Sequence, residues 1–84
     1  MDIIEGLDKA IDIIEATPEI NIIGVRDVLI RNVLSVGVPA DTLYDVLGYV
    51  VEIDQAILDN RVNSFDNRIG VLSRLKEIRY YSIS

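Results

Sequence analysis

Apolar residues recur every three or four positions along most of the chain, which is the spacing of helices that bury one side and expose the other. The pattern predicts helices over residues 2–16, 22–36, 40–58 and 63–80. Strand-like alternation occurs only over residues 19–25, where a glycine and the helical spacing that follows argue against a strand. The predicted fold class is therefore all-α, a small bundle of three to four amphipathic helices.

The buried face of each predicted helix follows from the same spacing. At about 100° per residue, the apolar side chains of one helix gather on one side. The expected core residues are Ile3, Ile4, Leu7, Ala10, Ile11 and Ile14 in the first helix, Ile22, Val25, Leu29, Ile30, Val33 and Val36 in the second, Leu43, Val46, Leu47, Val50, Val51, Ile53, Ile57 and Leu58 in the third, and Val62, Phe65, Ile69 and Leu72 in the fourth, with Leu75 and Ile78 beside them.

Capping and helix-breaking residues mark the helix ends. Before the second long helix, either Thr17 or Asn21 can act as the N-cap, and the sequence leaves both open. Gly37 and Pro39 mark the end of that helix. Residues 59–64, DNRVNS, are poor helix formers and predict a break after the third helix. Without that break, the last two helices would form one continuous rod of about 40 residues and about 60 Å, which an isolated chain of this size cannot bury.

The 84 residues suffice for one domain, spanning residues 1–84. Half of them are apolar, and the mean hydropathy of +0.32 is high for so small a chain. A chain of this size buries only roughly 60 % of the surface that its unfolded form exposes. We therefore expect part of the apolar surface to be covered by a second copy, as a homodimer or higher oligomer, or by another protein.

The residue types exclude several kinds of chemistry. The chain has no cysteine and no histidine, so it lacks disulfides, thiolate metal ligands and the commonest general base. Motifs for nucleotide, calcium and zinc-protease sites are absent too. We therefore expect no catalytic residue, no cofactor and no metal. Since no long uncharged apolar stretch and no signal peptide is evident, we also expect a cytoplasmic protein without a membrane segment.

The net charge of −6 is unevenly distributed. Residues 1–60 carry twelve acidic and three basic side chains, whereas residues 61–84 carry two acidic and five basic ones. The basic segment either packs against the acidic part of its own chain or presents a surface for an acidic partner. The candidate partner-binding side chains are Tyr44 and Tyr49, expected on the outer side of the third helix, and Arg61, Arg68, Arg74 and Arg79 in the last segment.

Two charged residues interrupt apolar stripes. Asp54 lies in the apolar face of the third helix, and Arg26 lies in that of the second. Opposite charges on two facing apolar stripes suggest an ion pair between the helices, which would fix their register. Two alternatives stay open: either residue reaches water near a helix end, or one of them awaits a ligand or a partner residue.

Taken together, these features favour a non-catalytic protein–protein interaction module, such as a small acidic adaptor, inhibitor or regulator that self-associates. Two other classes remain. The basic C-terminal helix with its nearby tyrosines can bind nucleic acid, which is less favoured because the chain is acidic. The acidic residues of the first helix can alternatively imitate DNA and inhibit a DNA-binding protein.

Overall fold

The computed structural model describes residues 3–36, 41–60 and 68–83. These residues form four α-helices and one short 3-10 helix, with no strand among them. In chain order the elements are α1 (Ile3–Ala16), α2 (Ile22–Asn32), η1 (Leu34–Val36), α3 (Asp41–Leu58) and α4 (Arg68–Ile83). The all-α fold class is confirmed. In this part of the chain no helix combines the length and the apolar character that crossing a membrane requires.

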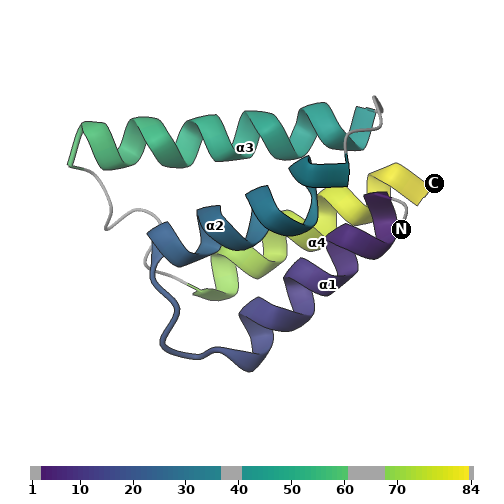
Figure 1. The fold of residues 1–84 in the computed structure, drawn as a ribbon, viewed down its shortest axis with the longest axis horizontal. Helices are drawn as coiled ribbons and strands as arrows, with labels where there is room; N and C mark the ends of the chain where they lie inside the picture. Colours follow the sequence, from purple (N-terminus) through teal and green to yellow (C-terminus); the bar gives the residue numbers. More distant parts are fainter. Residues whose placement is uncertain (1–2, 37–40, 61–67, 84) are drawn as a thin grey trace.

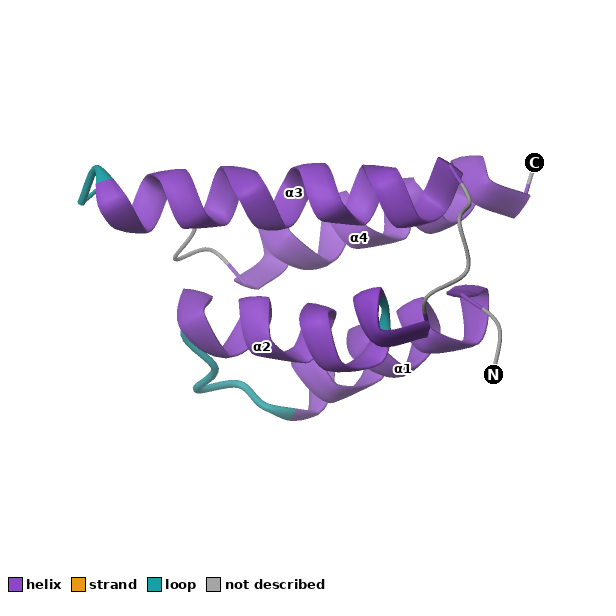
Figure 2. Ribbon diagram, turned by 45° about the horizontal axis from the view of Figure 1, so that its top comes forward, coloured by secondary structure: helices purple, strands orange, loops and turns teal. Residues whose placement is uncertain are grey.

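The helices run alternately up and down around one core (Figure 1). Helix α1 packs against α2 and α4, and α3 packs against the same two helices from the other side. Figure 2 shows the resulting two layers, α3 with α4 above and α2 with α1 below. The start of α1 and the end of α4 therefore lie at the same end of the bundle.

The core draws side chains from all four helices. The largest fully buried ones are Leu7, Ile14, Leu29, Val33, Val46, Ile53 and Leu75. All seven belong to the apolar stripes that the sequence predicts. The main source of stability is thus the burial of these side chains, at roughly 25 cal/mol per Å² of apolar surface.

Asn21, rather than Thr17, caps the start of α2. The Asn21 side chain accepts a hydrogen bond of 2.8 Å from the Gly24 amide, which satisfies one of the free donors at the helix start. The Thr17 hydroxyl instead donates to the Ile13 carbonyl at 2.7 Å, at the end of α1. Of the two N-cap residues that the sequence left open, the structure uses Asn21.

Helix α2 ends at Asn32, four residues before the predicted end. The chain then tightens into η1, where the Val36 amide donates to the Val33 carbonyl at 3.2 Å. Short 3-10 turns of this kind are common at helix C-termini. The predicted stop signals Gly37 and Pro39 lie outside the described residues.

Helices α3 and α4 are separate, so the alternative of one continuous rod is wrong. After Leu58 the chain turns, and Asn60 adopts a left-handed conformation with φ of 61°. Asparagine tolerates this conformation better than most residues, and it ends the helix. Helix α4 then runs back along α3 and packs against it.

The buried face of α3 differs from the predicted one. Leu47, Val51 and Leu58 were expected in the core but are exposed. The predicted core residues Val46, Val50 and Ile53 are buried, and Thr42, Tyr49 and Ala56 are buried with them. Apolar side chains cover more than half of the circumference of α3, so the sequence alone does not select the arc that meets α2 and α4.

Two other stripe residues are also exposed, Ile30 on α2 and Ile69 on α4. The other predicted residues beside them are buried: Val25, Leu29 and Val33 on the side of α2 next to Ile30, and Leu72 and Leu75 of α4, together with Val71. The predicted core residues Val62 and Phe65 lie outside the described part of the chain.

Candidate functional site

The structure brings Arg26 of α2 and Asp54 of α3 together. The Arg26 Nη1 donates to the Asp54 Oδ1 over 2.7 Å, across the seam between the two helices. The side chains are 30 % and 45 % exposed, so the pair is not inside the core as the apolar stripes suggested. Because solvent screens it, the pair contributes at most about 1 kcal/mol to the stability of one chain.

Large apolar side chains surround this ion pair on the surface. Ile23 and Ile30 lie three residues before and four after Arg26, on the same side of α2. Val51 and Leu58 stand in the same relation to Asp54 on α3.

Leu47 and Tyr44 extend the row along α3. We call the six side chains the α2–α3 face: Ile23, Ile30, Tyr44, Leu47, Val51 and Leu58, between 41 % and 78 % exposed. The sequence predicts only Tyr44 as an exposed member. The sequence indicates the exposure of the other members only indirectly, because α3 carries more apolar residues than one buried arc can hold.

Tyr49 is buried, only 4 % exposed, contrary to the expectation that it faces outward. The Arg74 guanidinium of α4 lies 5.2 Å from the centre of its ring, and Arg74 also pairs with Glu52 at 3.6 Å. Burial raises the pKa of the Tyr49 hydroxyl, partly opposed by Arg74 and reinforced by Glu52. Tyr49 therefore belongs to the α3–α4 contact and is not an exposed partner-binding residue.

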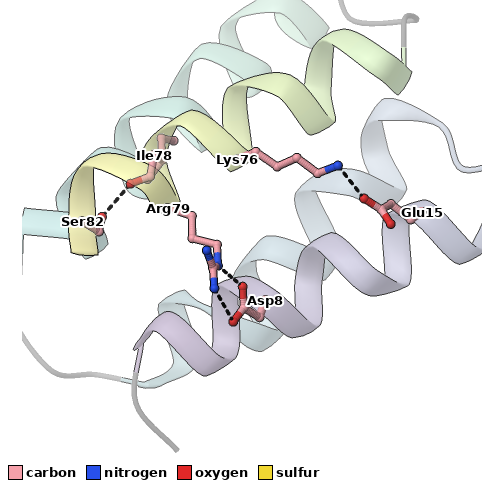
Figure 3. A network of polar contacts seen from close by, with 6 residues as sticks. All are labelled: Asp8, Glu15, Lys76, Ile78, Arg79 and Ser82. Atoms are coloured by element: carbon pink, nitrogen blue, oxygen red, sulfur yellow. Dashed lines mark hydrogen bonds and ion pairs between the residues drawn. The ribbon is translucent and has the colours of Figure 1, made fainter. Parts of the chain in front are cut away.

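The bases of α4 pair with acids of the same chain. Lys76 contacts Glu15 of α1 at 2.8 Å, and Arg79 donates from Nε and Nη2 to the two carboxylate oxygens of Asp8 of α1 (Figure 3). The hydrogen bond and charge of Asp8 raise the pKa of Arg79 above its already high value. For these bases and for Arg74, the interpretation that the basic segment packs against its own acidic part is confirmed.

The two remaining candidate bases cannot be placed. Arg61 lies outside the described residues, and Arg68 begins α4 with a side chain that is not described.

A groove of about 560 Å³ runs between α1 and α4. It is lined by Asp8, Ile11, Asp12, Glu15, Lys76, Arg79 and Tyr80. The two ion pairs of Figure 3 span it, so both of its bases are already paired with carboxylates across the helix contact. Within the described ranges, no three carboxylates converge closely enough to hold a metal ion.

The fold and these contacts define the chain as a small acidic four-helix bundle with an apolar face beside an interhelical ion pair. Its sequence matches no protein-family model, and neither curated proteins nor solved structures give a match. The argument for function therefore depends on the surface itself.

Proposed function

We propose that the protein is a non-catalytic protein–protein interaction module, a small acidic adaptor, inhibitor or regulator that self-associates. The observation that carries this proposal is the α2–α3 face. Six of the nine large apolar side chains that are exposed in the described residues lie on these two neighbouring helices, and the other three lie on α4.

The size of the face supports a docking role. If a fully exposed large apolar side chain presents about 200 Å², the six together expose roughly 600–700 Å². The largest apolar patch on a typical monomer is about 300–600 Å², and a standard interface buries about 800 Å² on each partner. The α2–α3 face with its immediate neighbours is therefore large enough for one interface.

The charge contacts weigh against the two other classes. The positive charges of Arg74, Lys76 and Arg79 are each paired with a carboxylate of the same chain, which leaves less positive charge for contacts with phosphates. The same pairs neutralise Asp8 and Glu15 of α1, which weakens the imitation of a DNA backbone.

Sedimentation at micromolar to hundred-micromolar concentrations tests the proposal. We expect the mass to rise with concentration above the 9.4 kDa of one chain. Val51→Lys should shift the chain back toward the monomer by at least about tenfold in Kd, since a lysine charge buried in an interface costs more than about 1.4 kcal/mol. Lysine lowers the net negative charge of the chain, so the loss cannot come from a larger overall charge repulsion between copies.

Ile69→Lys is the matched control, because Ile69 is an exposed apolar residue on α4, outside the α2–α3 face. It should associate like the wild type, and both variants should keep the helical circular dichroism of the wild type. A wild-type chain that remains a 9.4 kDa monomer throughout would refute self-association.

A further inference from the structure

The outward side of α3 carries no charge over four turns. Six exposed residues share an arc of about 100° at the helical spacing: Tyr44, Leu47, Gly48, Val51, Gln55 and Leu58. Among the described residues, a Cβ built on Gly48 meets nothing within 4 Å, so no contact in that part of the chain requires a glycine there. A glycine on an uncharged helix face allows a second backbone to approach closely.

The two edges of this uncharged arc differ in charge. One edge, which we call the acidic edge, consists of Asp41, Asp45, Glu52 and Asp59, all exposed. The other edge is the seam with α2, where Arg26 pairs with Asp54 and where Ile23 and Ile30 lie. Arg31, also exposed, lies in the last turn of α2.

A two-fold symmetric dimer uses the same face on both copies, so this asymmetry limits how the copies can meet. If the two-fold axis crosses α3, the two α3 helices are antiparallel and the two acidic edges fall on the same side of the interface. If the axis runs along α3, the helices are parallel and each acidic edge lies beside the partner's α2. The first arrangement sets the two acidic edges against each other. The second sets each acidic edge beside the partner's α2, where Arg26 is paired with Asp54 and the exposed Arg31 is balanced by the exposed Asp27, so like charges are kept apart.

We propose that two copies of the chain associate through the α2–α3 face about a two-fold axis that runs parallel to α3. This inference rests on the self-association proposed above and adds its geometry. The exposed area supports an interface of standard size. Covering the face also reduces the solvent exposure of the Arg26–Asp54 pair, whose two charges stay paired to each other within one chain.

Single cysteines test the geometry, since the chain contains none. Tyr44, Val51 and Leu58 lie seven residues apart along the middle of the uncharged arc of α3. Each is replaced by cysteine in turn, and each purified variant is oxidised mildly at a concentration where the wild type is associated. The measurement is the yield of disulfide-linked dimer by mass spectrometry without reductant.

With the axis along α3, each residue faces its own copy, so all three variants should form linked dimers. With the axis across α3 at Val51, the copies of residue 44 or of residue 58 would lie about 21 Å apart, far beyond the reach of a disulfide. In that case only Val51→Cys would link to itself, and a mixture of Tyr44→Cys with Leu58→Cys would form mixed dimers.

Ile69→Cys on α4 gives the yield from random collision, because Ile69 is exposed outside the face. Yields severalfold above this control at all three positions support the parallel arrangement. Linkage at a single position together with the mixed dimer overturns it, and so does background linkage at all three positions. Sedimentation of the wild type separates the two proposals: a stable monomer refutes self-association itself and leaves the face to a different protein.

Discussion

At the scale of single residues, Tyr49 shows how far an amphipathic side chain can be misjudged from a helical pattern. Its ring is apolar and its hydroxyl is polar, so a position at the border of the apolar arc can face either way. The Tyr49 ring packs against the Arg74 guanidinium, and Arg74 in turn pairs with the Glu52 carboxylate. These contacts allow the ring to be buried next to a charged side chain. Tyr44, five residues earlier on α3, is 63 % exposed.

The raised pKa of Tyr49 predicts how stability depends on alkaline pH. The unfolded chain ionises this tyrosine near pH 10, before the folded chain does, so its contribution is complete below about pH 10 and is lost as the pH rises through the folded pKa. Chemical denaturation from pH 9 to pH 11 should show a decline that is smaller in Tyr49→Phe. Tyr44→Phe is the control and should decline like the wild type. Equal declines in all three proteins would contradict the prediction.

The Arg26–Asp54 pair should show a small, measurable coupling. Arg26→Ala and Asp54→Ala should each cost about 0.5–1 kcal/mol, and the double variant should cost a few tenths of a kcal/mol less than the sum, because the pair is half exposed. Denaturant titration of the dilute protein measures all three. Arg26→Ala combined with Asp45→Ala should be additive, since Asp45 lines a pocket with α4 residues. Strict additivity for the first pair would argue against its energetic role.

At the scale of elements, Gly6 of α1 and Gly48 of α3 lie in opposite surroundings, one closely packed and the other open. A Cβ on Gly6 of α1 would overlap the backbone carbonyl oxygen of Asn32, at the end of α2. Because backbone cannot yield like a flexible side chain, this glycine sets how closely α1 approaches α2. A Cβ on Gly48 of α3 would meet nothing. The sequence indicates only that Gly6 weakens its helix, because the close approach comes from a residue 26 positions away.

This difference gives a matched pair of substitutions. Gly6→Ala should destabilise the fold by about 1–3 kcal/mol through the backbone overlap, despite the better helix propensity of alanine. Gly48→Ala should stabilise a dilute, monomeric sample by about 0.5–1 kcal/mol. Thermal or denaturant unfolding of both variants checks the prediction. A stabilised Gly6→Ala would mean that α1 and α2 are not in close contact.

At the scale of the whole molecule, ion pairs between helices favour one arrangement of the bundle. The excess of acids before residue 60 and of bases after it becomes a set of contacts that join α4 to α1 and α3. Each such surface pair is weak alone. Together they favour the arrangement in which the last helix returns alongside the first, and they leave α2 and the outer side of α3 as the surface with the fewest contacts of this kind.

The sequence by itself determined the all-α class, a bundle of three to four helices and most of the core, and it predicted the break near residue 60, since helical spacing and turn residues act locally. It also suggested an ion pair between Arg26 and Asp54. Only the tertiary structure decided which arc of α3 is buried, that Tyr49 lies inside while Leu47 and Val51 lie outside, and that Gly6 is a contact point. The physical reason is that a helix with apolar residues on more than half of its circumference can bury any of several arcs. The choice among them depends on neighbours that are distant in the sequence.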